Sequence, residues 1–250
     1  MNVEQINPYS DNEEKGGQVK EMFDSIAPAY DFMNSAMTMG LHRSWRNKAL
    51  KAAINSLDGY KTGSFNILDV ATGTGDVAFK LHSLLPQALI TGIDISEGML
   101  DIARKKLLEL PEDDRKLLAF GKADCLSLPF HDRQFSLITV AYGVRNFSRL
   151  RQGLEEMKRV LAPGGVLCII ELSTPQGFLT APAYKLYSRK IIPFIGRLVS
   201  GDSRAYSYLP ESIAASPQRE DMAALLRAAG FSSVEWKDLT FGAVTYYIAK

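Results

Sequence analysis

A glycine-rich turn between a buried strand and a helix constrains the fold of this chain more than any other feature. The turn reads DVATGTGD from Asp69 to Asp76, and it joins an apolar run at 65–71 to an amphipathic helical pattern at 75–85. Gly73 and Gly75 allow the backbone to turn tightly and to approach a ligand closely. The sequence therefore predicts an α/β fold with a ligand bound at this turn.

Apolar runs typical of strands alternate with helical patterns along most of the chain. The predicted strands occupy residues 65–71, 88–95, 116–124, 135–143, 165–173, 232–240 and 243–250. Strands that are buried on both faces have continuous apolar runs, as the central ones here do. The last two are joined by a short turn and should pair antiparallel. We expect a mostly parallel seven-stranded sheet with an antiparallel edge strand and helices on both faces.

The length of the chain and the order of its patterns predict one domain. With 250 residues the chain is short enough for a single core. Residues 1–17 are polar and predict a flexible tail, whereas 18–60 have helical spacing and predict a cap on a domain that spans 18–250. The stretch 174–215 is too long for an ordinary connection, so we expect a helical insertion there.

Composition argues against several classes of function. The formal charge is +1, from 29 Lys and Arg against 28 Asp and Glu, and this balance disfavours a nucleic-acid partner. Cys125, Cys168 and the three histidines show no metal-ligand spacing, so no metal is expected. The polar start and the lack of a long apolar run predict a cytoplasmic protein.

The glycine pattern alone fits two kinds of cofactor. With Ala78 it completes G-x-G-x-x-A, so an NAD-linked oxidoreductase is the rival interpretation. A dinucleotide places a pyrophosphate at such a turn, whereas S-adenosylmethionine carries a sulfonium and an ammonium. Asp69 should repel the first and attract the second, and Asp76 adds to this argument unless it serves only the helix dipole. Charge therefore favours S-adenosylmethionine.

Acidic residues also end the next two predicted strands. Asp94 lies 19 positions after Gly75 and can accept hydrogen bonds from ribose hydroxyls. Asp124 ends the third strand, and Cys125 beside it would supply backbone contacts to an adenine ring. A single aspartate at the end of a strand is as readily explained by a loop-capping role as by ligand binding. Three in consecutive strand–helix units favour a ligand crevice.

Several segments of the chain resemble a known family, the menaquinone and ubiquinone C-methyltransferases, and are most similar to its demethylmenaquinone methyltransferases. ILDVATGTGD and RVLAPGG occur widely among S-adenosylmethionine enzymes, whereas YGVRNF, AYSYLPES and an amino-terminal cluster of YD, HR and WR are more specific. The resemblance covers nearly the whole chain after residue 18. It implies the class I S-adenosylmethionine methyltransferase (Rossmann-like) fold.

The resemblance also implies an activity and a set of binding residues. The expected reaction is C-methylation of demethylmenaquinol to menaquinol, and the alternative acceptors are a ubiquinone precursor or another small lipid or phenol. The implied cofactor contacts are Thr74, Asp94, Asp124 and Cys125. The chain departs from the family pattern at Ala141, where some relatives have a serine, and at Tyr142, where phenylalanine is usual.

The resemblance places Arg145 and Asn146 at the catalytic centre. A quinone ring carbon is electrophilic, so the acceptor is expected to be the reduced quinol, which becomes nucleophilic when a hydroxyl proton is lost. Arginine donates five hydrogen bonds and stays charged, so Arg145 is interpreted as the stabiliser of the naphtholate. Asn146 would orient the ring oxygen. The alternative is that Arg145 only bridges loops.

A general base is needed to remove that proton. His42 titrates closest to neutral pH and is our candidate if the amino-terminal helices cover the site, with Asp31 and Tyr30 as rivals. A packed helix corner around His42 is an equally open interpretation.

The predicted insertion offers a surface for a lipid partner. Residues 174–200 are apolar and carry a basic set, Lys185, Arg189, Lys190 and Arg197. Such an element suits contact with the inner face of the plasma membrane, from which a lipophilic quinol would be taken. Helices that merely cover the pocket are the alternative. A homodimer is an open expectation.

Overall fold

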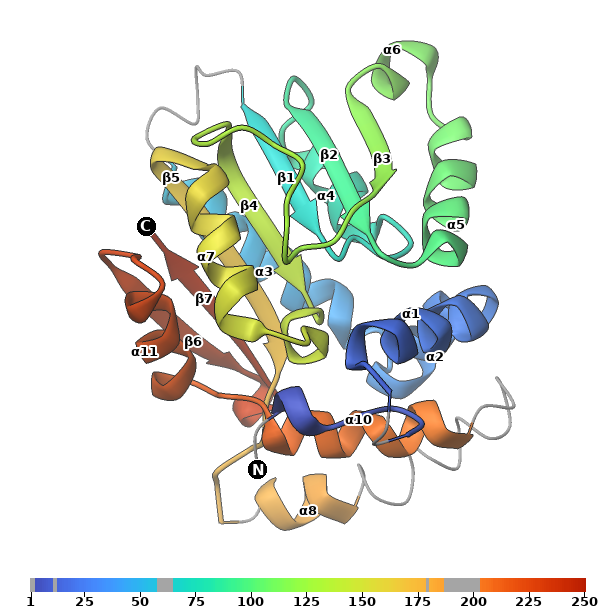
Figure 1. Ribbon diagram of the computed structural model, residues 1–250, viewed down its shortest axis with the longest axis vertical. Helices are drawn as coiled ribbons and strands as arrows, with labels where there is room; N and C mark the ends of the chain where they lie inside the picture. The colour runs from blue at the N-terminus through green and yellow to red at the C-terminus, as the bar shows by residue number, and fades with distance from the viewer. Residues whose placement is uncertain (1–2, 11–12, 58–64, 179, 187–202) are drawn as a thin grey trace.

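Seven strands form one sheet at the centre of the computed structural model, which describes residues 3–10, 13–57, 65–178, 180–186 and 203–250 (Figure 1). Their order is β3-β2-β1-β4-β5-β7-β6. The strands are β1 (Asn66–Val70), β2 (Leu89–Asp94), β3 (Leu118–Lys122), β4 (Phe135–Ala141), β5 (Leu161–Leu172), β6 (Val234–Leu239) and β7 (Val244–Ala249). β7 runs antiparallel to β5 and β6, and the other pairs are parallel. The predicted fold class is confirmed, with the antiparallel strand one place inside the edge.

Helices cover both faces of the sheet (Figure 1). The helices α7 (Leu150–Val160) and α11 (Glu220–Ala228) pack on one face, and α3 (Leu41–Asn55) and α4 (Asp76–Leu84) pack on the other. Side chains alternate along a strand, so Leu68 and Val70 of β1 face α7 while Ile67 faces α3 and α4. The next helices, α5 (Glu97–Leu108) and α6 (Glu112–Arg115), lead from β2 into β3.

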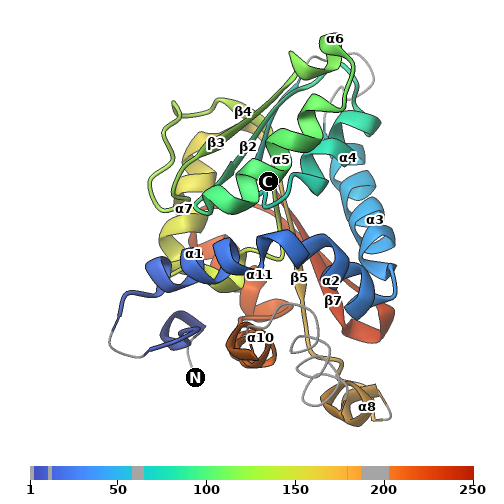
Figure 2. The same cartoon turned by 90° about the vertical axis from the view of Figure 1, so that its right-hand side faces the viewer.

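A helical cap lies at the carboxyl ends of the parallel strands. It consists of α1 (Lys15–Ile26), the short 3-10 helix η2 (Ala27–Ala29), α2 (Tyr30–Thr38) and the start of α3. Figure 2 shows α1 and α2 between the sheet and α10 (Ser203–Ala215), with α8 (Thr180–Leu186) on the far side of α10. Both α8 and α10 belong to the predicted insertion. Within the described ranges, every helix is too short or too polar to cross a membrane.

The amino-terminal segment packs against the body of the protein, which differs from the flexible tail that its polarity predicted. Val3, in the 3-10 helix η1 (Val3–Gln5), is buried, and the carboxylate of Glu4 accepts the backbone N–H of Leu150 at 2.7 Å. The ammonium of Lys15 is buried and donates to the carbonyl oxygens of Val3 at 2.6 Å and Arg145 at 3.0 Å. Polar groups can be buried when each finds a partner, and composition alone does not reveal such partners.

Candidate active site

Two cavities lie side by side at the carboxyl ends of the parallel strands. The strand-end cavity measures about 310 Å³, and its lining includes Gly73, Asp94, Asp124, Cys125 and Asn146. The cap cavity measures about 290 Å³, and its lining includes Met33, His42, Arg145, Tyr208 and Ile213. Phe23, Tyr30 and Tyr142 belong to both linings. The cavities therefore share a wall made of three aromatic side chains.

The glycine turn is held in place by the carboxylate of Asp94. One oxygen of this carboxylate accepts the N–H of Gly73 at 2.8 Å, and the other accepts the N–H of Ser96 at 2.9 Å. Burial raises the pKa of Asp94 above its usual value, and the backbone N–H groups partly oppose this shift. Each carboxylate oxygen has a second lone pair, so Asp94 can still accept from a ligand.

Gly73 leaves open space beside the turn. Its backbone is left-handed, with φ +56°, and a Cβ added there would meet no atom within 4 Å. Because Gly73 lines the strand-end cavity, its missing side chain leaves the backbone open to a ligand, as the sequence predicted.

Asp69, a predicted cofactor residue, does not line either cavity. Alternation along β1 turns Asp69 away from the side of Leu68 and Val70 and towards Thr139 on the adjacent strand. Its two oxygens accept the hydroxyls of Thr139 and Thr72, each at 2.6 Å. Burial raises the pKa of Asp69 to about 6, and the two hydroxyls partly offset this effect. Asp69 braces the turn from inside the sheet.

Thr74 and Gly75 are also absent from the cavity linings, in contrast to the prediction. The Thr74 hydroxyl donates to Asp31 of α2 at 2.7 Å, and Gly75 is the left-handed residue before α4. Asp31 also accepts Lys106 at 2.6 Å. The turn is therefore fastened to the cap on its outer side, and only Gly73 of the three predicted turn residues faces the cavity.

Asp76 completes this outer fastening. Its carboxylate binds Lys106 at 2.9 Å and Arg46 at 2.9 Å. Burial raises the pKa of Asp76, but the two cations outweigh this effect and leave it below the usual value. Asp76 thus serves the contact between α3, α4 and α5.

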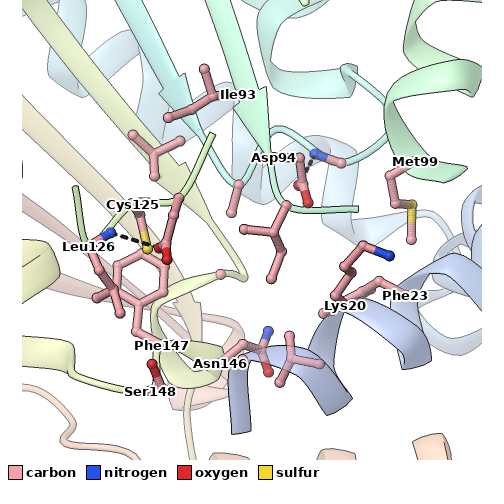
Figure 3. Close-up of a pocket in the computed structure, with 18 of the residues that line it drawn as sticks. Lys20, Phe23, Ile93, Asp94, Met99, Cys125, Leu126, Asn146, Phe147 and Ser148 are labelled. Carbon is pink, nitrogen blue, oxygen red and sulfur yellow. Dashed lines mark hydrogen bonds between the residues drawn. The ribbon is translucent and has the colours of Figure 1, made fainter. Parts of the chain in front are cut away.

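Asp124 and Cys125, both predicted to contact the cofactor, line the strand-end cavity. They follow β3, and the carboxylate of Asp124 accepts the N–H of Leu126 at 2.8 Å. Figure 3 shows Cys125 and Leu126 on one side of the hollow, with Lys20 and Phe23 of α1 on the other. Burial raises the pKa of the Cys125 thiol, which therefore stays protonated and unreactive near neutral pH.

Charges of both signs surround the strand-end cavity, so its rim is not simply anionic. The carboxylates are Glu14, Asp94 and Asp124, and the cations are Lys20, Lys122 and Arg149. Such a rim suits a ligand that itself carries both signs of charge. The acidic groups nearest the glycine turn and the strand ends remain Asp94 and Asp124.

Arg145 lines the cap cavity and pairs with a buried carboxylate. It lies in the 3-10 helix η3 (Val144–Asn146), and its guanidinium binds Glu171 at 2.7 Å. Burial would lower the pKa of Arg145, but Glu171 outweighs this effect and raises it, so the guanidinium is charged. The Nε of Arg145 is buried and has no hydrogen-bond partner among the described residues. The guanidinium therefore keeps one donor that no described residue uses.

Asn146 is hydrogen-bonded to α10, and the two residues of this hydrogen bond line different cavities. Its side-chain oxygen accepts the hydroxyl of Tyr208 at 3.0 Å. Asn146 lines the strand-end cavity and Tyr208 lines the cap cavity. The amide of Asn146 is thus oriented by the insertion.

His42 lines the cap cavity, and of the rival bases only Tyr30 also does. Burial lowers the pKa of His42, with Arg46 and Arg43 contributing in the same direction, so the imidazole is neutral near pH 7. Burial raises the pKa of Tyr30, which keeps its phenol protonated. Asp31 is engaged by Thr74 and Lys106. Of the three candidate bases, His42 and Tyr30 therefore line the cap cavity, and His42 is the one that is not held protonated.

Three residues of this site were not foreseen from the sequence. Glu171 carries the counter-charge of Arg145, Lys15 contacts the Arg145 carbonyl, and Tyr142 stands in the shared wall. Glu171 did have a signal, because it is the one acidic residue in the apolar run Val166–Leu172. A buried acid is almost always paired, so that run implied a cationic partner.

No group of three or more metal-ligating side chains occurs in the part of the chain that the structure describes.

Comparison with known proteins gives consistent matches over the full chain. A model of the ubiE/COQ5 methyltransferase family matches residues 10–250. A Bacteroides fragilis protein named demethylmenaquinone methyltransferase is 47% identical over 247 residues, which cover 98% of this chain and 97% of that protein. A protein of the same name from Deinococcus radiodurans is 42% identical over 242 residues, covering 97% and 96%. A Geotalea daltonii protein named ubiquinone/menaquinone biosynthesis C-methyltransferase UbiE is 42% identical over 235 residues, covering 94% and 96%.

Solved structures share the fold at low sequence identity. A SAM-dependent methyltransferase of Thermotoga maritima has a TM-score of 0.59 at 19% identity, covering 92% of this chain and 98% of that chain. The cyclase SpnF has a TM-score of 0.65 at 17% identity, covering 94% of both chains. These matches support the architecture alone.

Proposed function

The chain belongs to the ubiE/COQ5 methyltransferase family, and we propose that it transfers a methyl group from S-adenosylmethionine to a ring carbon of demethylmenaquinol, giving menaquinol. Relatives that match over nearly their full length carry the name demethylmenaquinone methyltransferase. The observation that carries the proposal is the pair of adjoining cavities, because methyl transfer requires donor and acceptor to meet in line and away from water.

The strand-end cavity suits the donor. Gly73 offers open backbone, Asp94 has lone pairs for the ribose hydroxyls, and Asp124 with Cys125 would flank the adenine. When bound, S-adenosylmethionine supplies an electrophilic methyl group, and the electron pair of the broken carbon–sulfur bond stays on sulfur.

The cap cavity suits an apolar ring that carries a hydroxyl group, whose oxygen becomes negatively charged when the proton is lost. Its wall is mainly apolar, with Met22, Met33, Met37 and Ile213 among its residues. The charged guanidinium of Arg145, which lines this cavity, would stabilise the naphtholate oxygen, and this interaction would strengthen as negative charge develops. Asn146, held by Tyr208, would orient the ring oxygen from the side of the donor.

His42 would accept the hydroxyl proton of the quinol. A neutral imidazole that lines the cap cavity has a lone pair with which it can accept a proton, as a general base must. Loss of this proton makes the ring carbon nucleophilic. After methyl transfer, the methylated carbon loses its proton to solvent and the ring oxygen takes back a proton from the His42 imidazolium. The aromatic quinol is thereby restored, and one proton is released overall.

The direct test is incubation of the protein with methyl-labelled S-adenosylmethionine and chemically reduced demethylmenaquinone. The expected product is menaquinol, which is heavier by one methylene and carries the label, as mass spectrometry would show. The oxidised quinone should not react. Labelled product from the quinone, or no product from the quinol, would contradict the proposal.

A ubiquinone precursor is the second candidate acceptor, because a full-length relative at 42% identity is named for both quinones. The same assay with the benzoquinol precursor decides between single and dual specificity. If each quinol inhibits methylation of the other competitively, both rings bind in the same cavity.

A cytoplasmic location at the inner face of the plasma membrane, and a homodimer, stay predictions. Most of the residues that carry the membrane prediction, including Arg189, Lys190 and Arg197, lie outside the described residues. Replacing these three and Lys185 by glutamine should weaken cosedimentation with anionic vesicles, because each basic residue near such a surface contributes about 1 kcal/mol. If the wild type and this variant cosediment equally, the insertion does not bind the membrane through these residues, and covering the pocket is its remaining predicted role.

A further inference from the structure

A threonine hydroxyl contacts the imidazole of His42 at the corner between two cap helices. Thr38 is the last residue of α2, and His42 lies in the first turn of α3. Met39 and Gly40 between them have left-handed backbones, with φ 49° and 77°, which turns the chain back on itself. The hydroxyl oxygen of Thr38 and Nδ1 of His42 are 2.7 Å apart.

The proton of this hydroxyl is already used elsewhere. Thr38 donates to the carbonyl oxygen of Asn34 at 2.6 Å, and a carbonyl oxygen can only accept. A hydroxyl has one proton to donate and two lone pairs with which to accept. The two lone pairs of Thr38 face the backbone N–H of His42, at 3.5 Å, and Nδ1 of its ring.

This hydrogen-bond arrangement decides which ring nitrogen carries the proton. Because Thr38 has no second proton, Nδ1 must donate to it, and a neutral imidazole carries only one proton. Nε2 is then unprotonated. Nε2 has no hydrogen bond to any described residue, and the ring lines the cap cavity.

We propose that Thr38 is a positioning residue that fixes His42 in the Nδ1–H tautomer and so leaves Nε2 free to accept a proton. The catalytic part of this inference rests on the proposed function, whereas the tautomer itself does not. In the reaction, the quinol O–H bond breaks and the proton forms an N–H bond at Nε2. The resulting imidazolium keeps its Nδ1–H bond to Thr38 and faces the naphtholate.

The charged groups around His42 leave the ring neutral, so its tautomer matters. Burial is the main effect that disfavours the charged ring, and Arg46 and Arg43 of its own helix add to it. Asp76 of α4 and Asp31 of α2 oppose this effect, but the pKa of His42 still falls below its ordinary value. If Nε2 carried the proton of the neutral ring, His42 would have no lone pair facing the cavity with which to take the hydroxyl proton of the quinol.

Nitrogen-15 NMR of histidine-labelled protein tests the tautomer without any assay of activity. The chain has three histidines, and the signals of His42 are those that vanish in His42→Gln. At pH 8 the wild type should show a protonated Nδ1 and an unprotonated Nε2. Thr38→Val, which keeps the shape and removes the acceptor, should shift the ring towards Nε2–H, and Thr38→Ser should restore the wild-type pattern. An Nε2–H ring in the wild type, or an unchanged ring in Thr38→Val, would overturn the inference.

Kinetics test the consequence. Thr38→Val should lower kcat for the quinol at least roughly tenfold while leaving the Kd for S-adenosylmethionine unchanged, and Thr38→Ser should rescue the rate. Equal melting temperatures would show that folding is intact. A wild-type rate in Thr38→Val would show that the tautomer lock does not serve catalysis. Absence of methyl transfer in the wild type would instead contradict the proposed function, and the NMR result would still decide the tautomer.

Discussion

Asp94 illustrates how one side chain can hold a turn and also line a cavity. It fixes the N–H of Gly73 and the N–H of Ser96, and it lines the cavity with lone pairs to spare. Its position at the cavity was predictable because the carboxyl ends of parallel strands meet at one edge of a sheet. Asp69 was equally visible in the sequence, but its side chain lies against Thr139 on the neighbouring strand. Side chains alternate between the two faces of a strand, and the type of a residue does not reveal which face it occupies.

Asp94→Asn should weaken binding of S-adenosylmethionine roughly 10- to 100-fold, because a hydrogen bond to a charged acceptor contributes about 1.5–3 kcal/mol. The amide also presents an N–H group to the ribose hydroxyls or to the turn. Isothermal titration calorimetry measures the change. Asp101→Asn on the exposed side of α5 is the matched control and should bind like the wild type. Equal affinity of the two variants would remove Asp94 from the binding site.

The Arg145 and Glu171 pair should behave as a unit in folding. Arg145→Ala should lower the free energy of unfolding by about 3–5 kcal/mol, because Glu171 is then buried without a counter-charge. Arg145→Met combined with Glu171→Met removes both charges and should cost less, although it should still lack methyl transfer. Urea denaturation measures the stability of each. A double variant as unstable as Arg145→Ala would show that the pair is not coupled.

At the scale of elements, the buried ammonium of Lys15 joins the amino-terminal helix η1 to the helix η3 that carries Arg145. Burial, with Arg145 adding to it, lowers the pKa of Lys15 to about 8 from an unfolded value of 10.5. Between these pH values the unfolded chain binds more protons than the folded one, so the contribution of Lys15 to stability should rise with pH. Below pH 8 both states are protonated and this contribution is constant.

Lys15→Met should therefore remove the part of the pH dependence that Lys15 causes. The difference in unfolding free energy between the wild type and the variant should grow between pH 8 and 10.5, as urea denaturation at a series of pH values would show. The variant should also be less stable at pH 7, because the carbonyls of Val3 and Arg145 lose their donor. A difference that does not change with pH would contradict the buried position of Lys15.

The sheet was predictable element by element, whereas the contacts between the cap and the sheet were not. Continuous apolar runs and glycine turns are local signals, and they located all seven strands. The fastening of Asp31 to Thr74 joins residues 43 positions apart, and the contact of Lys15 with Arg145 joins residues 130 apart. No local pattern contains such pairings, so the segment before α1 looked like a tail, and the cap was expected without its attachments.

At the scale of the whole molecule, ligand binding should stabilise the fold selectively. S-adenosylmethionine at about 100 times its Kd should raise the free energy of unfolding by about 2.7 kcal/mol. For a chain of this size that corresponds to a rise in Tm of roughly 5–10 °C. NAD at the same concentration should have no effect. Stabilisation by NAD but not by S-adenosylmethionine, measured by differential scanning fluorimetry, would reverse the choice of cofactor.

The aromatic partition formed by Phe23, Tyr30 and Tyr142 limits how this protein can change during evolution. A smaller side chain at one of these positions would enlarge the cap cavity for a bulkier ring, but it would also change the shape of the strand-end cavity. The affinity for the methyl donor would then change together with the preference for the acceptor. Far-side positions such as Met33, Met37 and Ile213 touch only one chamber. Divergence towards new quinols should therefore accumulate on that remote side, leaving the partition as the slowest part of the site to vary.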